Sequence, residues 1–231
     1  MSKKLCIIPA RGGSKRIPKK NIKFFLDKPI ISYSIETALS SGLFDEIMVS
    51  TDDEEIAEIA ISFGATVPFF RSEKNSDDYA TTIDVITEVI NEYNKLGKEF
   101  EYTCCIYPCA PLLSTTRLIE SFQELISFNL DCVFPIVRFG FPIQRAVKIY
   151  NGNLIKMYQP EFMQTRSQDL EPSFHDAGQF YFFNTEEIVK CHKLWTTNTG
   201  FIELTEIESQ DIDNLVDWDL AVLKYKLVNK I

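Results

Sequence analysis

The chain has 231 residues, which suffice for one sizeable α/β domain but not for two independent hydrophobic cores. Its formal net charge of -9 argues against general nucleic-acid binding, and no stretch approaches the roughly 18 apolar residues of a membrane-spanning helix. The short apolar run near the N-terminus does not resemble a signal peptide, so we expect a cytoplasmic protein, with no membrane partner and with its six cysteines reduced.

Strands and helices alternate along the first part of the sequence. Residues 4–10 form a short β-branched run typical of a buried strand, and apolar residues at helical spacing predict a helix over Ile30–Ser41. Asp52 is the expected N-cap of a helix that Gly64 ends. Further strands are expected over 46–50, 67–70, 102–107 and 132–137, and further helices over 81–96 and 116–128. This alternation predicts a Rossmann-like α/β fold, with a mostly parallel sheet and helices on both faces.

The pattern changes after residue 137. Residues 146–150 and 154–158 flank the turn Asn151-Gly152-Asn153, and this arrangement predicts a β-hairpin. Strands over 179–183 and 200–204 and an amphipathic helix over 215–228 complete the expected elements. A hairpin inserted into an α/β core often covers a substrate or reaches a partner subunit. We therefore expect one domain, 1–231, with an inserted hairpin and dimerisation arm at about 138–178.

A strongly basic turn follows the first predicted strand. Six Lys and Arg residues and no acidic residue lie between Arg11 and Lys23. Gly12 and Gly13 would let the backbone approach an anion closely, and doubly wound sheets bind ligands at this end of a strand. The spacing matches neither the P-loop nor the dinucleotide-binding fingerprint. The turn therefore predicts a phosphate site, although its charge alone would also suit a solvated loop.

The same turn carries a resemblance to a known family. Residues 7–17, Ile-Ile-Pro-Ala-Arg-Gly-Gly-Ser-Lys-Arg-Ile, and Lys20-Asn21-Ile22 resemble the opening of the acylneuraminate cytidylyltransferases, the CMP-nonulosonate synthetases. Val49-Ser50-Thr51-Asp52 and Asp211-Ile212-Asp213 also fit, and the resemblance covers nearly the whole chain. Within that family the chain looks most like the pseudaminic acid cytidylyltransferases, in segments 67–71, 107–111, 141–145, 166–170 and 175–181.

The resemblance implies a fold, a reaction and a set of residues that bind the nucleotide. The fold would be of the nucleotide-diphospho-sugar transferase type, in a homodimer. The anomeric hydroxyl of a nonulosonic acid, here pseudaminic acid, would attack the α-phosphorus of CTP and release pyrophosphate. Arg11, Lys20 and Asp211 would be catalytic. The residues implied to bind the nucleotide are Ala10, Arg11, Gly12, Gly13, Ser14, Lys15, Lys20, Asn21, Arg71, Asp78, Thr81 and Thr82.

Asp211 and Asp213 are the candidate metal ligands. In an extended segment, residues two apart point to the same side, so both carboxylates can face one Mg²⁺ ion. Alone this spacing is a weak signal, because acidic loops often contain it. The basic turn and the family resemblance make a metal site the better interpretation. Asp217 and Asp219 repeat the spacing, but they lie at the start of a predicted helix.

The acceptor pocket must bind an acidic sugar, whose carboxylate calls for a bidentate arginine or for amide donors. His175 could deprotonate the sugar hydroxyl or orient it. Tyr107 stands where the sialic acid enzymes usually carry Gln, so the resemblance makes sialic acid a less expected substrate. The candidate substrate-binding residues are Tyr107, Gln144, Arg145, Arg166, Gln168, His175 and Gln179, of which those at 144–168 could instead be surface or intersubunit residues.

Three alternatives stay open on the sequence alone. A neighbouring family member would use legionaminic, sialic or deoxyoctulosonic acid. A nucleotide-binding module would keep the phosphate turn without turnover. A glycosyltransferase would use Asp-Ile-Asp for its metal, but the cationic turn suits a free triphosphate better than an esterified diphosphate.

Overall fold

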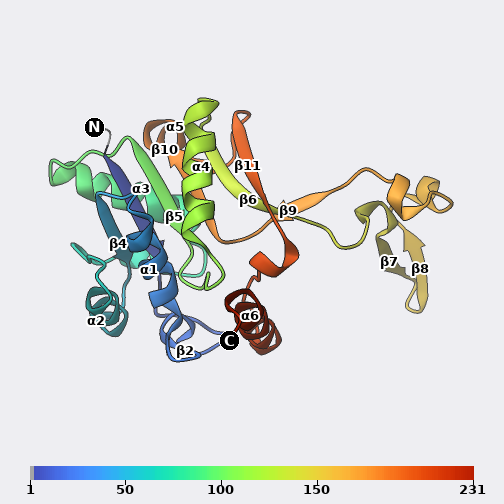
Figure 1. The fold of residues 1–231 in the computed structure, drawn as a ribbon, viewed down its shortest axis with the longest axis horizontal. Coiled ribbons are helices and arrows are strands. Elements are labelled where there is room, and N and C mark those ends of the chain that lie inside the picture. The colour runs from blue at the N-terminus through green and yellow to red at the C-terminus, as the bar shows by residue number, and fades with distance from the viewer. Residues whose placement is uncertain (1–2) are drawn as a thin grey trace.

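A mixed β-sheet forms the centre of the molecule (Figure 1). The computed structural model describes residues 3–231. The strands of the main sheet are β1 (Lys4–Pro9), β4 (Glu46–Ser50), β5 (Tyr102–Ile106), β6 (Cys132–Arg138), β9 (Phe174–Asp176), β10 (Phe180–Asn184) and β11 (Thr199–Leu204). They pair in the order β11-β6-β10-β5-β1-β4, with β9 also beside β6. The pairs of β1 with β4 and β5, and of β11 with β6, are parallel.

The strand that returns from the arm departs from the expected parallel order. β10 lies between β5 and β6 and is antiparallel to both. β9 is antiparallel to the far end of β6, and Gly178, with a φ of 65°, separates β9 from β10. The chain leaves β6 for an excursion and comes back alongside it, so the returning strand runs in the opposite direction. The sheet is therefore mostly parallel, with one antiparallel return.

Side chains of β1 alternate between the two faces of the sheet. Cys6 and Ile8 belong to one buried cluster, whereas Leu5 and Ile7 belong to another. The first cluster includes residues of α1 (Ile30–Ser41), α2 (Glu54–Ser62) and α4 (Thr115–Ser127), and the second includes residues of α3 (Thr82–Lys95) and α5 (Thr185–Cys191). Helices thus cover both faces, as the sequence predicts. None of the helices in residues 3–231 combines the length and apolarity needed to cross a bilayer.

A third buried cluster holds the C-terminal helix against the N-terminal region. Trp218 of α6 (Leu215–Asn229) packs on Phe25 with 5.6 Å between the ring centroids. Phe25 belongs to a short antiparallel pair, β2 (Phe24–Phe25) with β3 (Lys28–Pro29). The sequence predicts an amphipathic helix here, but α6 also exposes 59% of Leu223 and 67% of Leu227. The helix therefore leaves apolar side chains on the surface.

Two local predictions are corrected by the structure. Asp53, rather than Asp52, caps α2, because its Oδ1 accepts a hydrogen bond from the backbone N of Ile56 at 3.0 Å. The segment 67–70 is not a strand: pairing with β4 is limited to one bridge, between Met48 and Thr66. Pro68, two residues after Thr66, has no N–H to donate, so the ladder cannot continue.

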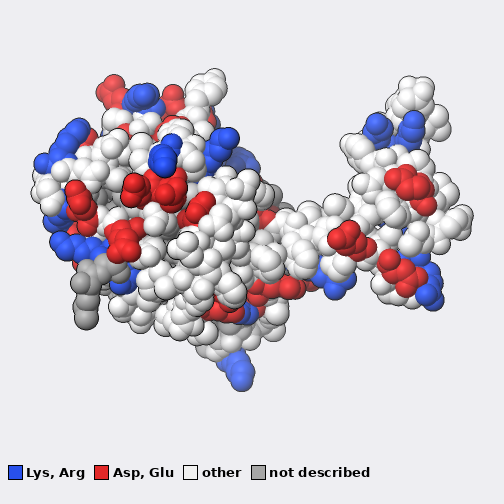
Figure 2. Space-filling model, turned by 90° about the horizontal axis from the view of Figure 1, so that it is seen from above, with Lys and Arg blue, Asp and Glu red and all other residues white. Residues whose placement is uncertain are grey.

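An arm, residues 139–173, projects from the sheet between β6 and β9 (Figure 1). It contains the antiparallel strands β7 (Val147–Tyr150) and β8 (Leu154–Met157), joined through Asn151 and Gly152 in left-handed backbone conformations. Figure 2 shows the arm as a lobe that a narrow neck joins to the body. Its hairpin exposes 79% of Ile149 and 73% of Ile155. The arm thus carries apolar side chains away from the core.

Candidate active site

A cavity of about 630 Å³, called here the central cavity, opens at the carboxyl ends of β1 and β5. It collects residues from the basic turn, the loop after β5 and the segment before α6. This is the edge at which doubly wound sheets bind ligands. Its lining residues are Pro9, Arg11, Ser14, Lys15, Arg16, Ile17, Lys20, Asn21, Asp78, Tyr107, Pro108, Cys109, Gly178, Asp211, Ile212 and Asp213.

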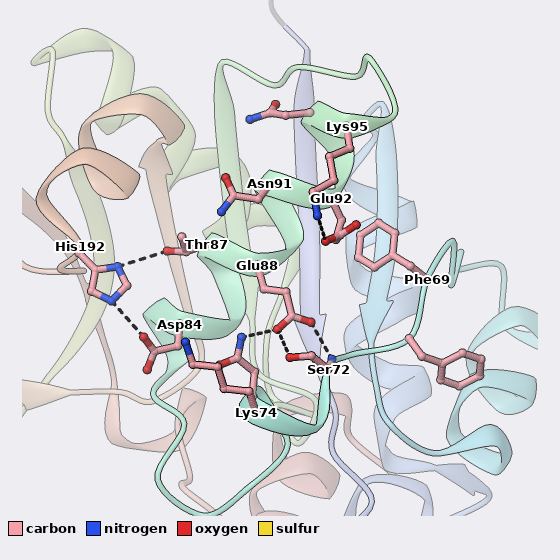
Figure 3. Close-up of a pocket in the computed structure, with 13 residues that line it drawn as sticks. Phe69, Ser72, Lys74, Asp84, Thr87, Glu88, Asn91, Glu92, Lys95 and His192 are labelled. Atoms are coloured by element: carbon pink, nitrogen blue, oxygen red, sulfur yellow. Dashed lines mark hydrogen bonds and ion pairs between the residues drawn. The ribbon is translucent and has the colours of Figure 1, made fainter.

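A larger hollow of about 1130 Å³ lies beside α3, but its carboxylates are already engaged (Figure 3). Glu88 accepts hydrogen bonds from the backbone N of Ser72 at 2.8 Å and from its hydroxyl at 2.6 Å. Asp84 Oδ1 lies 3.0 Å from His192 Nε2, and the same carboxylate closes the cap of α3 with Thr81. These groups hold α3 and its neighbours together. We therefore place the candidate site in the central cavity, despite its smaller volume.

The basic turn is pinned to the loop that precedes α2. The backbone N of Gly12 donates to Asp52 Oδ1 at 2.9 Å. A Cβ on Gly12 would lie 2.7 Å from Asp53 Oδ2, which is closer than real Cβ atoms approach. A Cβ on Gly13 would meet no atom of the described chain within 4 Å. Gly12 is thus required for close packing, whereas Gly13 leaves open space through which a ligand could approach the backbone.

Gly12→Ala is expected to lower the free energy of unfolding by about 1–3 kcal/mol, because the added methyl group displaces the carboxylate that caps α2. Gly13→Ala is the matched control and should unfold at the wild-type denaturant concentration. Chemical denaturation followed by circular dichroism measures both. Equal midpoints for the two variants would show that the Asp53 side chain moves aside without cost.

Asp78 faces two cations of the basic turn. Its Oδ1 lies 3.0 Å from Arg11 Nη1, and its Oδ2 pairs with Lys15 Nζ. Arg11 Nη1 also donates to the backbone O of Asp77 at 2.7 Å. The hydrogen bond from Lys15 is the main cause that holds the pKa of Asp78 below its usual range. In this structure Asp78 is therefore an anion beside the cations that were predicted to bind phosphate.

Two other residues of the turn hold parts of the site in place. Lys20, in the short helix η1 (Lys20–Ile22), donates from Nζ to the backbone O of Ile212 at 2.8 Å. Asn21 is buried; its Nδ2 donates to Arg11 O at 2.9 Å, and its Oδ1 accepts from Cys109 Sγ at 3.3 Å. Asn21 therefore shapes the turn, and Lys20 ties the turn to the segment that carries the two aspartates.

Asp211 and Asp213 line the same cavity as the basic turn. Arg16 Nη2 lies 2.7 Å from Asp213 Oδ1. Asp211 opens onto the cavity, yet burial, followed by repulsion from Asp213, raises its pKa, while Lys20 acts in the opposite direction. Two carboxylates that disfavour each other's charge suit a hard divalent cation with oxygen ligands. Residues 3–231 contain no group of three His, Cys, Asp or Glu side chains that could hold a metal alone. A cation would therefore need further ligands from substrate or water.

A second hollow of about 410 Å³ shares Asp211 with the central cavity. Arg138, His175 and Lys224 are among its lining residues. His175 Nδ1 lies 2.8 Å from the backbone O of Asp176. Lys224 Nζ donates to a backbone carbonyl at 2.7 Å, and burial lowers its pKa. Two cavities that meet at one carboxylate provide room for two substrates.

Some predicted residues lie behind the cavity rather than in its lining. Arg71 is 8% exposed, and its Nε donates to Ser50 Oγ at 3.0 Å. Ala10 is fully buried. Gln179 is 3% exposed, and its Nε2 donates to Glu208 O at 2.6 Å. The structure thus does not bring these three predicted residues to the cavity of this chain, because their polar groups serve internal hydrogen bonds or their side chains are enclosed.

Tyr107 links the cavity to the start of α3. Its side chain lines the cavity, and its hydroxyl lies 3.1 Å from Thr82 Oγ1. Thr81 is the N-cap of the same helix and accepts from the backbone N of Asp84. Burial raises the pKa of Tyr107 to about 12, so the phenol stays neutral. In this structure Thr81 therefore caps α3, and Thr82 contacts the Tyr107 ring's hydroxyl.

The four arm residues predicted to bind the sugar do not line the central cavity or the second hollow. Gln144 Nε2 donates to Glu171 O at 2.9 Å, and Arg145 Nη2 donates to Thr165 O at 2.5 Å. Arg166 pairs with an acidic neighbour at 2.7 Å. Gln168 lines a small hollow at the base of the arm. The hydrogen bonds of Gln144, Arg145 and Arg166 given above thus all end on other residues of the arm.

Comparison with known proteins identifies the family. Residues 5–193 match the family model described as Cytidylyltransferase. The chain belongs to this family. The cytidylyltransferase is 41% identical over 225 residues to the Pseudaminic acid cytidylyltransferase of Campylobacter jejuni, a match that covers 97% of each chain. It is 32% identical to the CMP-N,N'-diacetyllegionaminic acid synthase of Legionella pneumophila, over 94% of each chain.

A solved structure shares the fold of the cytidylyltransferase. It is a CMP:2-keto-3-deoxy-manno-octonic acid synthetase complexed with CTP, with a TM-score of 0.70 over 100% of both chains. The sequence identity is 17%, so this likeness supports the fold alone. The expected nucleotidyltransferase architecture, a mostly parallel sheet between helices, is therefore confirmed.

The sequence analysis did not single out Arg138 and Lys224, which line the second hollow of the cytidylyltransferase. Arg138 ends β6, and polar residues at the carboxyl end of a strand in such a sheet often face the ligand. That signal was present in the sequence. Lys224 lies within α6, where nothing in the local pattern distinguishes it from other surface lysines. Only the folding of α6 against residue 209 brings it to the second hollow.

Proposed function

We propose that this cytidylyltransferase transfers CMP from CTP to pseudaminic acid and releases pyrophosphate. The observation that carries the proposal is the central cavity, in which the cationic turn after β1 faces the pair Asp211 and Asp213. Such a turn suits a free triphosphate, and such a pair suits an ion that bridges phosphate oxygens. The Campylobacter jejuni relative named for this activity matches over 97% of each chain.

The cationic turn would hold the triphosphate. Arg11, Lys15 and Lys20 supply positive charge, and Ser14 and the open backbone at Gly13 supply hydrogen-bond donors. Arg11 and Lys20 would have the catalytic role, because charge grows on the leaving pyrophosphate as the bond to the α-phosphorus breaks. Lys20 already contacts the segment of the aspartates, so it lies between the two halves of the site.

Asp211 and Asp213 would hold a divalent cation, Mg²⁺ in this proposal, with phosphate oxygens as further ligands. When bound, the ion would neutralise phosphate charge and favour an in-line geometry. Asp211 also lines the second hollow, where the acceptor sugar would lie. Arg138 and Lys224 would face its carboxylate, and His175 would orient its hydroxyl or accept its proton.

We also propose a homodimer in which each arm reaches the acceptor side of the other copy. The arm projects from the body, and its hairpin exposes Ile149 and Ile155 (Figure 1). Exposed apolar side chains on a long excursion are typical of a surface that a partner covers. Such an arrangement would bring to the sugar four residues that line neither the central cavity nor the second hollow of their own chain, namely Gln144, Arg145, Arg166 and Gln168.

Asp78→Asn is expected to tighten CTP binding by about two- to fivefold at low ionic strength, because the carboxylate competes with the triphosphate for Arg11 and Lys15. Titration calorimetry with CTP and Mg²⁺ measures the effect. Glu55→Gln is the matched control, since Glu55 pairs with Lys19, whose side chain does not line the central cavity. Weaker binding by Asp78→Asn would instead show that the carboxylate contacts the nucleotide directly, as the family resemblance implies.

The function is tested by pyrophosphate release. The protein is incubated with CTP, Mg²⁺ and each of pseudaminic, legionaminic, sialic and deoxyoctulosonic acid. We expect release with pseudaminic acid. Release with legionaminic acid alone would favour the second candidate, which the relative at 32% identity supports. If no acid gives pyrophosphate although CTP binds, the chain is a nucleotide-binding module without turnover.

A further inference from the structure

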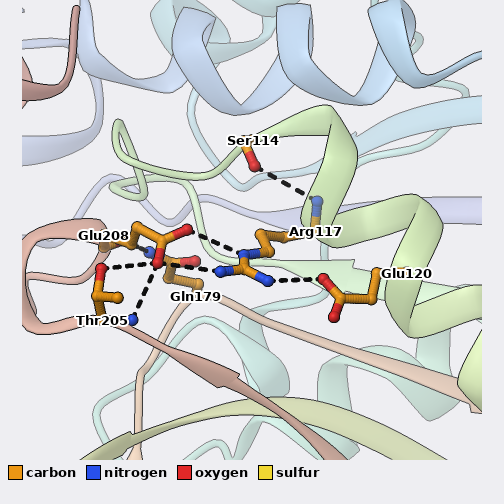
Figure 4. A network of polar contacts seen from close by, with 6 residues as sticks. All are labelled: Ser114, Arg117, Glu120, Gln179, Thr205 and Glu208. Atoms are coloured by element: carbon orange, nitrogen blue, oxygen red, sulfur yellow. Dashed lines mark hydrogen bonds and ion pairs between the residues drawn. The ribbon is translucent and has the colours of Figure 1, made fainter.

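A bidentate ion pair joins α4 to the segment that carries the two aspartates (Figure 4). Arg117, in the first turn of α4, donates Nε to Glu208 Oε1 at 2.9 Å and Nη2 to Glu208 Oε2 at 3.1 Å. Its third nitrogen, Nη1, donates to Glu120 at 2.7 Å. The Arg117 and Glu208 side chains are only 26% and 25% exposed. The hydrogen bonds from Arg117 are the main cause that lowers the pKa of Glu208 to about 2, so this carboxylate is charged at neutral pH.

Glu208 also organises its own segment. In the short helix η6 (Glu206–Glu208), its carboxylate accepts hydrogen bonds from the backbone N of Thr205 at 2.9 Å and from the Thr205 hydroxyl at 2.7 Å. Its backbone O accepts from the buried Gln179 at 2.6 Å. Gln179 in turn accepts at its backbone O from the N of Tyr107 at 2.8 Å. One residue therefore connects α4, the start of β10 and the loop that carries Tyr107.

Asp211 lies three positions after Glu208, in a segment whose two ends are fixed by hydrogen bonds. Immediately after Glu208, Ser209 Oγ donates to Ala177 O at 3.0 Å. Beyond Asp211, the Ile212 side chain is buried and its carbonyl accepts from Lys20 at 2.8 Å. The Asp211 side chain itself opens onto the cavity. Its position is thus set by neighbours on either side, and the Arg117–Glu208 pair fixes the upstream side.

We propose that Arg117 and Glu208 are positioning residues that hold Asp211 where a divalent cation and the phosphates of the nucleotide require it. This inference rests on the proposed function. A largely desolvated ion pair adds little net stability, since desolvation offsets the attraction, but a bidentate pair fixes geometry strongly. Ligands of a metal depend on such outer partners for their orientation, and a small displacement of a ligand costs affinity and rate.

The test compares Glu208→Gln and Arg117→Lys with the matched control Glu120→Gln, which removes the other partner of Arg117 but leaves the aspartate segment anchored. Binding of Mn²⁺ to each variant is measured by electron paramagnetic resonance, without substrates. For Glu208→Gln we expect Mn²⁺ binding weaker by about tenfold and kcat lower by about tenfold, with a nearly unchanged KM for CTP at saturating Mg²⁺. Arg117→Lys keeps the positive charge but cannot make both hydrogen bonds to Glu208. Its Mn²⁺ affinity and kcat should therefore lie between those of Glu208→Gln and the wild type. Glu120→Gln should behave as the wild type.

Hydrogen exchange of the backbone amides in 209–213 gives a second measurement that needs no turnover. We expect faster exchange in Glu208→Gln and Arg117→Lys than in Glu120→Gln. Wild-type Mn²⁺ binding and wild-type exchange in both variants would overturn the proposal, as would a wild-type chain that binds no Mn²⁺. If the wild type binds Mn²⁺ but releases no pyrophosphate, the proposed function fails while these two measurements still decide the positioning role. If Glu208→Gln does not fold, Arg117→Lys decides it.

Discussion

Asp211→Asn is expected to reduce kcat by about a thousandfold, equivalent to about 4 kcal/mol of transition-state stabilisation. The substitution preserves the volume of the side chain and removes one of the two carboxylate charges that face the basic turn. The remaining Asp213 is already paired with Arg16 at 2.7 Å, so it cannot replace the missing charge. Pyrophosphate release at saturating CTP, pseudaminic acid and Mg²⁺ measures the loss.

A matched control separates the position of the charge from its number. Asp219→Asn removes the same charge from an exposed residue of α6, in the Asp-x-Asp spacing that repeats that of Asp211 and Asp213. It should keep wild-type turnover, and both variants should keep the wild-type circular dichroism spectrum. Wild-type turnover in Asp211→Asn would exclude this carboxylate from the metal site.

The second large effect concerns the arm. The double variant Arg145→Ala/Arg166→Ala is expected to lower kcat/KM for the acceptor sugar by about a hundredfold, or about 3 kcal/mol, because the sugar loses two arginines that the arm of the other copy would bring to it. CTP binding should be unaffected, since neither arginine lines the central cavity of its own chain. Steady-state kinetics with the sugar varied at saturating CTP, together with calorimetric titration of CTP, measures both quantities.

Subunit mixing tests whether the arms act across the dimer. The double variant and Asp211→Asn, each nearly inactive, are unfolded together and refolded. In a mixed dimer one site combines an intact Asp211 with an intact arm from the other copy. Random pairing makes half of the dimers mixed, so activity should recover to about a quarter of the wild-type value. No recovery would show that the arginines do not serve the site of the other copy.

Much of the fold follows from local patterns, but the direction of one strand does not. The helix over Ile30–Ser41 has the predicted bounds, because its apolar spacing and the Gly42 stop are both local signals. β10 was predicted as a strand, yet its fully buried run of aromatic residues reads the same for a parallel or an antiparallel neighbour. Its direction depends on the path of the arm, which no short window of sequence contains.

The candidate site also combines features that local sequence patterns predict with features that only the folded chain shows. Arg11, Lys20, Asp211 and Asp213 line one cavity. The place of the first two at the carboxyl end of a strand could be predicted, whereas the aspartates were singled out by their spacing and by the family resemblance. The pairing of Asp78 with the basic turn joins residues 63 positions apart and could not be read from spacing. Internal hydrogen bonds of buried polar residues, such as that of Gln179, likewise appear only when the chain is folded.

The arm leaves and re-enters the sheet at a single place, where Arg138 of β6 and Phe174 of β9 are paired. Everything between them can change in length or sequence without altering the order or register of the other strands. Under the proposed role of the arm, such a layout would let contacts to the sugar change separately from contacts to the nucleotide. One lineage could exchange its acceptor while inheriting the phosphate turn intact.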